Sequence, residues 1–261
     1  HRTKKDSRPA RVVMTSILYD HVMSPLYDRL VVIWPASVHP NFITSLGGLC
    51  CAVSIVAMAR GRWGLACACY TAYHMFDNMD GKHARRTQQT SRFGKVLDHA
   101  IDGTVGITAA CQICCECLFD YPDALRFSLC CGMAAMLICH AAEHVSGIAT
   151  LGTRFFSADE LFILCSLALA WRAAAAVPLL RLGDEAKFFV QFGWVLSLVG
   201  LALLTVRELK WLVLLGAFGL FCALCPWPVP VVIYVPCLGA VLVSNALRYS
   251  NTTCDKVAHQ S

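Results

Sequence analysis

Charged residues are scarce in this sequence. Only 15% of its 261 residues are Asp, Glu, Lys or Arg, whereas a soluble globular domain carries about 25%. Hydrophobic residues make up 57% of the chain, and its mean hydropathy is +0.57. This shortage of charge excludes an ordinary soluble domain. We therefore expect the chain to be an integral membrane protein that has the lipid bilayer as its solvent.

The basic residues that remain do not form a surface for nucleic acid. They gather before the first apolar segment and again within residues 82–95, and in both places they adjoin apolar stretches. Lys and Arg stay on the cytosolic side of membrane proteins, which accounts for this distribution. We therefore predict a cytosolic N-terminus, a cytosolic 82–95 segment and no nucleic-acid partner.

The N-terminal part of the chain differs from the rest. Residues 15–35 place apolar side chains at helical spacing with charged residues between them. This pattern predicts an amphipathic helix that lies along the membrane surface. We find no repeats or linkers, so we divide the chain into residues 1–38, a basic cytosolic region with the surface helix, and residues 39–261, a single membrane catalytic domain.

Long apolar runs follow the surface helix. A spanning helix needs about 20 mainly apolar residues, and eight runs approach this length, of which the last two are interrupted by prolines. Ser157 is a candidate N-cap for the fifth of these helices. Asp159 and Glu160 then fall in its first turn, where acidic residues interact favourably with the helix dipole. The sequence thus predicts an all-α, polytopic membrane bundle. The predicted spans are 41–60, 63–82, 94–118, 124–144, 157–178, 187–206, 209–225 and 229–247.

The sixteen cysteines do not predict a disulfide framework. Most of them lie within apolar runs, where a thiol acts as a small hydrophobic group. Cys111, Cys114, Cys115 and Cys117 have a spacing that resembles a zinc site. They lie in a hydrophobic helix without clear polar neighbours, so we favour a packing role for them as well.

Four aspartates stand at regular offsets near the 82–95 segment. Asp77 and Asp80 are three residues apart, and Asp98 and Asp102 are four apart. Each pair therefore shares one face of its helix. The two helices are consecutive and antiparallel, and both pairs lie at their cytosolic ends. We expect the four carboxylates to meet at one depth, just inside the membrane.

Four carboxylates so close together repel one another. Hard divalent cations such as Mg²⁺ or Mn²⁺ would neutralise them, and a pair of metals about 4 Å apart is a common device for displacement at phosphorus. Gly81, Ala84 and Gly94 leave room beside the backbone for a bulky ligand, and Arg85 can grip phosphate oxygens. An interhelical salt-bridge cluster is the alternative, but it does not require acids at such regular offsets.

This constellation resembles the signature of the CDP-alcohol phosphotransferase family. The pattern Asp-x2-Asp-Gly-x2-Ala-Arg-x8-Gly-x3-Asp-x3-Asp runs without a departure from Asp77 to Asp102. The resemblance implies a six-helix core, here with about two further C-terminal spans, and often a homodimer. It implies two divalent metals held by Asp77, Asp80, Asp98 and Asp102, and a cytidine diphosphate held by Gly81, Ala84, Arg85 and Gly94. It also implies a nucleotide contact for Asn41, for which a helix-capping role is an open alternative.

Two stretches are similar to choline and ethanolamine phosphotransferases in particular. Asp80-Gly-Lys-His-Ala-Arg-Arg-Thr resembles their Asp-Gly-Lys-Gln-Ala-Arg-Arg-Thr, and Asp98-His-Ala-Ile-Asp resembles their Asp-His-Gly-Cys-Asp. The implied reaction transfers phosphocholine or phosphoethanolamine from CDP-choline or CDP-ethanolamine to diacylglycerol and releases CMP. The implied location is the endoplasmic reticulum first and the Golgi second, with the active site facing the cytosol.

Other functions remain as alternatives. The nearest is a CDP-diacylglycerol-dependent phosphatidyltransferase of the phosphatidylinositol or phosphatidylserine synthase type. The segment around Glu143 departs from the choline/ethanolamine pattern, because Glu143 lies one place late. A transporter or channel would carry its acids at mid-membrane depth on several helices, whereas these acids gather at one edge.

The acceptor hydroxyl needs a base in this reaction. His99 is our first candidate, because the ordinary pKa of histidine lies near neutrality, and Glu143 is a candidate to orient it. Asp102 is the rival base. The alternatives are that His99 only donates a hydrogen bond that holds Asp98, and that Glu143 is an interfacial anchor.

Overall fold

The described part of the chain is entirely helical. The computed structural model describes residues 16–118, 125–146, 157–180 and 229–248. Every regular element in these residues is a helix, and none is a strand. The all-α prediction is therefore confirmed for this part of the chain. The predicted spans 187–206 and 209–225 lie outside the described residues.

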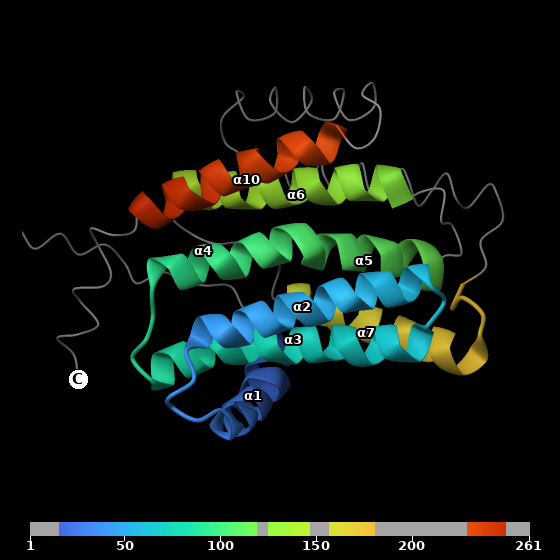
Figure 1. The fold of residues 1–261 in the computed structure, drawn as a ribbon, viewed down its shortest axis with the longest axis horizontal. Helices are drawn as coiled ribbons and strands as arrows, with labels where there is room; N and C mark the ends of the chain where they lie inside the picture. The colour runs from blue at the N-terminus through green and yellow to red at the C-terminus, as the bar shows by residue number, and fades with distance from the viewer. Residues whose placement is uncertain (1–15, 119–124, 147–156, 181–228, 249–261) are drawn as a thin grey trace, which may run out of the picture.

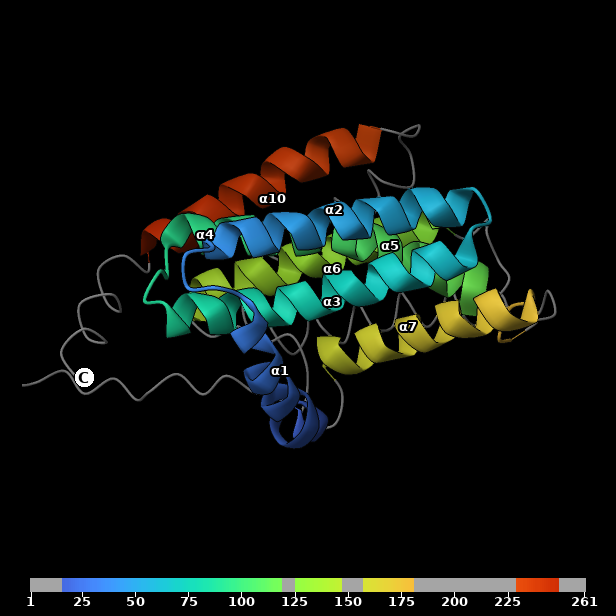
Figure 2. The same ribbon diagram turned by 60° about the horizontal axis from the view of Figure 1, so that its bottom comes forward.

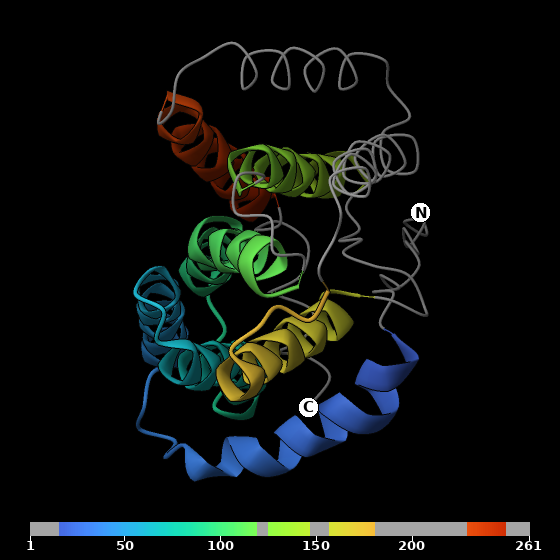
Figure 3. The ribbon, with the colours of Figure 1, turned by 90° about the vertical axis from the view of Figure 1, so that its right-hand side faces the viewer.

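The amphipathic segment is helical, as predicted. It consists of η1 (Tyr19–Met23), α1 (Ser24–Leu30) and η2 (Val31–Ile33). Figure 3 shows this segment crossing beneath the bundle, next to α3 and α7. Tyr27 and Val31 are buried against Met79, whereas Leu26 is 45% exposed. The helix therefore has a face that packs on the bundle and an apolar face that is free; its place at the membrane surface stays a prediction.

The first helix of the bundle is α2 (Pro40–Ala59). It begins with proline, whose fixed φ suits a first helical turn, and the His39 ring accepts a hydrogen bond from the Asn41 backbone N–H at 3.1 Å. The cap is thus His39, so the alternative capping role of Asn41 is wrong. Among the described helices, α2 is the one long and apolar enough to cross a membrane by length and composition.

The second helix, α3 (Trp63–Arg86), runs past the predicted end of its span at residue 82. Hydropathy falls where the charged residues begin, but Lys, Arg and Ala are good helix formers. The helix therefore continues through Ala84 and Arg85, and the connection to the next helix is shorter than the predicted 82–95 segment. This extension keeps all of Asp77, Asp80 and Arg85 on one rigid element.

The predicted span 94–118 is a run of four helical elements. They are α4 (Arg92–Ile101), η3 (Asp102–Gly106), α5 (Ile107–Ile113) and η4 (Cys114–Leu118). The run begins earlier than predicted because the Ser91 hydroxyl accepts a hydrogen bond from the Gly94 backbone N–H at 2.9 Å. The η3 element is a π-helical turn that starts at Asp102. Such turns often mark functional sites.

Three further helices complete the described fold: α6 (Leu125–Ser146), α7 (Ala158–Ala175) and α10 (Val229–Arg248). Ser157 caps α7 as predicted, and the Glu160 carboxylate accepts a hydrogen bond from the Ser157 backbone N–H at 2.7 Å. Figure 1 shows α10 beside α6, and Figure 2 shows α7 below α3, with the long helices running roughly parallel. Each of the three lies where the sequence predicts a span.

Two adjacent glycines place α2 against both acid-bearing helices. A Cβ atom on Gly47 would lie 3.3 Å from Cβ of Phe76 on α3, and one on Gly48 would lie 3.0 Å from Cδ1 of Ile101 on α4. Helices approach closely where such small residues face a partner. The Gly47–Gly48 pair therefore sets the spacing of α3 and α4 through their common neighbour.

No disulfide joins the cysteines within the described residues. Cys111, Cys114 and Cys117 are almost fully buried, and the Cys111 thiol donates to the Ser128 carbonyl oxygen at 3.4 Å. They lie in the apolar clusters that join α5 to α6 and α7. Their surroundings fit the packing role that we favoured over a zinc site.

We predict that Gly103→Ala destabilises the fold. A Cβ atom there would lie 2.5 Å from Cδ2 of Leu238, a side chain of α10 that is only 1% exposed. Overpacking of this kind costs about 1–3 kcal/mol, so the melting temperature of the purified protein in detergent should fall. Gly64→Ala is the matched control, because nothing lies within 4 Å of its Cβ position. Equal melting temperatures for the two variants would contradict the assigned contact of η3 with α10.

Candidate functional site

Three of the four predicted aspartates meet in the structure. Asp77 comes from α3, Asp98 from α4, and Asp102 begins η3. One carboxylate oxygen of each lies within 4.8 Å of those of the other two. Carboxylates so close together and partly shielded from water need a compensating positive charge. Hard oxygen ligands in this number suit a divalent cation such as Mg²⁺ or Mn²⁺, so the residues present fit the metal that the sequence predicts.

The fourth aspartate, Asp80, stands apart from this group of three. Its side chain is only 6% exposed, and the Thr44 hydroxyl donates a hydrogen bond to its Oδ2 at 2.5 Å. The structure therefore directs one oxygen of Asp80 to α2. Asp80 and Asp98 both line the adjoining pocket, so Asp80 lies at the edge of the acidic group and not at its centre. Sequence reasoning did not single out Thr44.

Tyr73 is a second residue that sequence reasoning missed. Its hydroxyl donates a hydrogen bond to Oδ1 of Asp102 at 2.6 Å, and the residue is 1% exposed. A Cβ atom on Gly106 would lie 2.5 Å from this hydroxyl, so only glycine admits the tyrosine here. Tyr73 lies four residues before Asp77 on α3, which is a position on the same helix face. This four-residue spacing is the feature of the sequence from which Tyr73 could have been selected as a site residue.

A pocket of about 190 Å³ adjoins the aspartates between α2, α3 and α4. The Arg85 guanidinium lies 3.4 Å from the position of a Cβ atom on Gly81. A Cβ atom on Gly94 would lie 2.9 Å from Oδ1 of Asn41. Both glycines therefore keep open space that a larger residue would fill. The structure brings all the predicted nucleotide-binding residues to this one pocket, namely Asn41, Gly81, Ala84, Arg85 and Gly94.

His99 and Glu143 line a second, smaller cavity together with Lys95 and Asn245. The Glu143 side chain is buried, and its Oε1 accepts a hydrogen bond from the Lys95 ammonium at 2.7 Å. Nδ1 of His140 lies 3.7 Å from its other oxygen. The predicted neighbours His99 and Glu143 thus line the same cavity, and Glu143 interacts with Lys95 and His140, which sequence reasoning did not select as its partners.

His140 lies between Glu143 and His99. The rings of His99 and His140 have their centroids 5.0 Å apart. Within the described part of the chain, Nδ1 of His99 is buried without a hydrogen-bond partner. An imidazole nitrogen with no protein partner is available to a ligand, which is compatible with the predicted role of His99.

The C-terminal helix α10 supports both parts of the site. The Tyr234 hydroxyl donates to the carbonyl oxygen of Gly103 at 2.6 Å, directly after Asp102. The Asn245 amide donates to the carbonyl oxygen of His140 at 3.0 Å. The sequence predicted a span here but no contact with the site. Residues more than a hundred positions downstream therefore fix the backbone beside Asp102 and His140.

Comparisons with known proteins show which sequences this chain resembles. A family model described as CDP-alcohol phosphatidyltransferase matches residues 37–225. The chain is similar to cholinephosphotransferase 1 of Saccharomyces cerevisiae, with 29% identity over 43% of this chain and 32% of the relative. It is similar to cholinephosphotransferase 1 of Gallus gallus, with 28% identity over 66% of this chain and 56% of the relative. For choline/ethanolaminephosphotransferase 2 of Arabidopsis thaliana the identity is 33%, over 33% of this chain and 25% of the relative. The chain thus matches between a quarter and just over half of the length of these relatives.

We predict that Tyr73→Phe weakens divalent-metal binding. The substitution removes the hydrogen bond that orients the Asp102 carboxylate, and loss of such support typically costs about 10–100-fold in metal affinity. Titration of the purified protein with Mn²⁺, followed by electron paramagnetic resonance, measures the effect. Tyr70→Phe is the control, because this neighbouring ring packs edge-on against Tyr73 in the same core. An unchanged affinity of Tyr73→Phe for Mn²⁺ would contradict the assignment of Asp102 to the metal site.

Proposed function

The chain belongs to the CDP-alcohol phosphatidyltransferase family, and from this premise we propose that it transfers phosphocholine or phosphoethanolamine from a CDP-alcohol to diacylglycerol. The products are phosphatidylcholine or phosphatidylethanolamine and CMP. The observation that carries the proposal is the position of the acidic group beside the pocket that holds Arg85, Gly81 and Gly94. The names of the similar proteins support the choice of choline and ethanolamine as the alcohols.

Asp77, Asp98 and Asp102 would hold the metal, with Asp80 contributing from the edge of the group. We propose two Mg²⁺ or Mn²⁺ ions, as in the predicted site. Divalent cations held by these carboxylates would supply electrostatic stabilisation for the charge that develops on the departing CMP phosphate. The Tyr73 hydroxyl keeps the Asp102 carboxylate in place for this purpose.

The pocket between α2, α3 and α4 receives the nucleotide. Arg85 can bind phosphate oxygens through two parallel hydrogen bonds, which also fixes their direction. Gly81 and Gly94 allow the diphosphate to approach the helix backbones, and Asn41 faces Gly94 across the pocket. These residues position the donor so that its β-phosphorus lies near the carboxylates.

His99 acts as the base in this proposal. The acceptor oxygen forms a bond to the β-phosphorus, the bond from that phosphorus to the CMP oxygen breaks, and the acceptor proton moves to the His99 imidazole. Asp102 is less suited to this role, because its Oδ1 already accepts a hydrogen bond from Tyr73. Glu143 and His140 form the polar surroundings that hold the imidazole in position.

We place the catalytic helices in a membrane, with the aspartates toward the cytosol. Apolar side chains on α2 support this placement, since Phe42 is 57% exposed and Leu49 is 60% exposed. The segment η1–α1–η2 would then lie at the bilayer surface. Location in the endoplasmic reticulum, assembly as a homodimer and a single membrane domain over residues 39–261 remain predictions from the sequence.

A donor panel tests the proposed reaction. Purified protein in mixed micelles with diacylglycerol and Mg²⁺ or Mn²⁺ should release CMP from CDP-choline or CDP-ethanolamine and form the corresponding phospholipid. EDTA should stop turnover reversibly, and Asp98→Ala should abolish it while the protein stays folded in detergent. Product formation only from CDP-diacylglycerol and a soluble alcohol would replace the proposal by the phosphatidyltransferase alternative. Undiminished turnover in Asp98→Ala would reject the metal site.

We predict that His99→Ala lowers the rate at least about a hundredfold, the effect expected for the loss of a general base. Steady-state kinetics with CDP-choline and diacylglycerol measure the change. His21→Ala is the control, because His21 is an exposed histidine on η1. If His99→Ala retains its activity, the base role passes to Asp102.

A further inference from the structure

A second large cavity, of about 260 Å³, lies between α1, α3 and α7. The nucleotide pocket lies instead between α2, α3 and α4. Both cavities share α3, on which His74 lies one helical turn before Asp77. We call this second space the α1/α7 cavity. It is therefore close to the reacting centre along α3 and opens on another side of that helix.

The lining of the α1/α7 cavity is mostly apolar and contains a single histidine. None of its lining residues is Asp, Glu, Lys or Arg. Burial raises the pKa of the Tyr27 phenol well above its ordinary value, so this hydroxyl stays protonated. Apolar side chains make up most of the surface, namely Met23, Leu26, Leu30, Met75, Ile163 and Leu167. Such a lining suits an uncharged, mainly apolar ligand.

Two polar atoms in this lining lack a hydrogen-bond partner. Nε2 of His74 and Oγ of Ser166 are both buried, and neither has a hydrogen-bond partner within the described residues. The whole His74 residue is only 4% exposed. Buried polar atoms in folded proteins are nearly always hydrogen-bonded. These two therefore point to a ligand that supplies oxygen atoms inside an otherwise apolar space.

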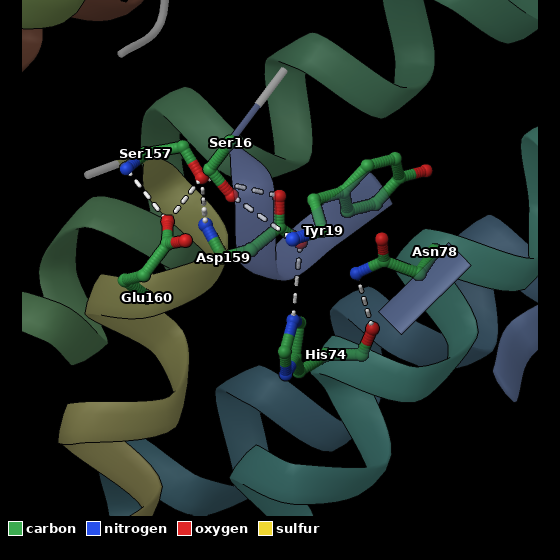
Figure 4. Close-up of polar contacts among 7 residues, drawn as sticks. All are labelled: Ser16, Tyr19, His74, Asn78, Ser157, Asp159 and Glu160. Atoms are coloured by element: carbon green, nitrogen blue, oxygen red, sulfur yellow. Dashed lines mark hydrogen bonds and ion pairs between the residues drawn. The ribbon is translucent and has the colours of Figure 1, made fainter. Parts of the chain in front are cut away.

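The His74 ring is held firmly from two sides. It stacks on Phe162 of α7 with the ring centroids 4.6 Å apart, and it meets Tyr27 of α1 edge-on at 6.1 Å. Figure 4 shows the ring directed toward Asp159, in the first turn of α7. Nε2 of His74 lies 3.6 Å from Oδ1 of Asp159, which is within ion-pair distance but longer than a hydrogen bond. The fixed ring thus keeps hydrogen-bonding capacity for a ligand.

The neighbouring carboxylate selects against anions. Asp159 lies beside His74, and no basic side chain lines the cavity to balance a phosphate group. An anionic lipid head would meet like charge in a poorly hydrated space, which is unfavourable. On the outer side, Leu26 is 45% exposed and Leu167 is 61% exposed. The rim is therefore apolar, as an opening toward lipid chains requires.

We propose that the α1/α7 cavity binds the glycerol ester part of a neutral diacylglycerol, with His74 and Ser166 as donors to its ester carbonyl oxygens. The acyl chains leave along the apolar rim, and the free hydroxyl is carried along α3 toward the aspartates. The inference rests on the proposed function, because it names the binding site of the lipid acceptor. It also makes His74 and Ser166 determinants of selectivity for neutral over anionic glycerolipid.

Photocrosslinking tests the proposal without turnover. The full chain in nanodiscs is irradiated with a diacylglycerol that carries a diazirine near its glycerol esters, with neither CDP-alcohol nor metal present, and the labelled peptides are identified by mass spectrometry. We expect labels on α1, α3 and α7 at this cavity. His74→Phe with Ser166→Ala keeps a ring for stacking but removes both donors, and should lower labelling at least about tenfold, as the loss of two hydrogen bonds implies. His21→Phe is the matched control on the exposed part of η1.

Competition separates the possible occupants of the cavity. Unlabelled diacylglycerol should suppress labelling, whereas phosphatidic acid at the same mole fraction should not. Equal competition by phosphatidic acid or CDP-diacylglycerol, labelling at other helices, or undiminished labelling of the double variant would each overturn the proposal. Ser166→Ala alone, checked for a monodisperse elution profile, keeps the test valid if the double variant does not fold. Because labelling needs no reaction, its failure is distinguishable from a failure of the proposed transfer.

Discussion

Mutual repulsion of carboxylates is the constraint on which the rest of the structure depends. Asp77, Asp98 and Asp102 come from two separate helices, yet their oxygens approach within 4.8 Å. Such an approach is unfavourable unless a cation neutralises it, and it also needs a scaffold that holds the helices at a fixed spacing. The Gly47–Gly48 pair of α2 provides this spacing, because each glycine admits a side chain from one of the two helices. Packing on α2 thus offsets the electrostatic cost of bringing the acids together.

The scaffold also controls the direction of each carboxylate. The Thr44 hydroxyl of α2 donates a hydrogen bond to one oxygen of Asp80, and the Tyr73 hydroxyl donates one to an oxygen of Asp102. The Tyr73 contact requires Gly106 in the π-helical turn, and Tyr234 of α10 binds the carbonyl oxygen of Gly103 in that same turn. A departure from regular helix therefore starts at Asp102 and is stabilised from both sides. This explains why a distant C-terminal helix belongs to the site.

The sequence predicted the parts of the site that depend on helical periodicity. Offsets of three and four residues determine which side chains share a face, so the aspartates and the pocket residues around Gly81 and Arg85 could be found from spacing alone. The roles of His140 and α10 could not be found in this way, because they depend on how the helices pack. Tyr73 shares a helix face with Asp77 by the same spacing, but its hydrogen bond to Asp102 depends on the π-helical turn. The end of α3 was misplaced for another reason: hydropathy reports depth in a membrane, whereas helix length here follows propensity as far as Arg86.

The nucleotide pocket and the α1/α7 cavity are both lined by α3, which gives this helix two roles. One lies on the side of α2 and α4 and carries Arg85, which suits a water-soluble diphosphate; the other lies on the side of α1 and α7 and has an apolar lining. The proposed transfer between a soluble donor and a lipid acceptor requires two separate binding sites that meet at the reacting atoms. His74 and Asp80 belong to different cavities, and Asp77 lies between them on the same helix. In the proposed reaction a single rigid helix would therefore fix the distance between donor and acceptor, which is how positioning contributes to a displacement at phosphorus.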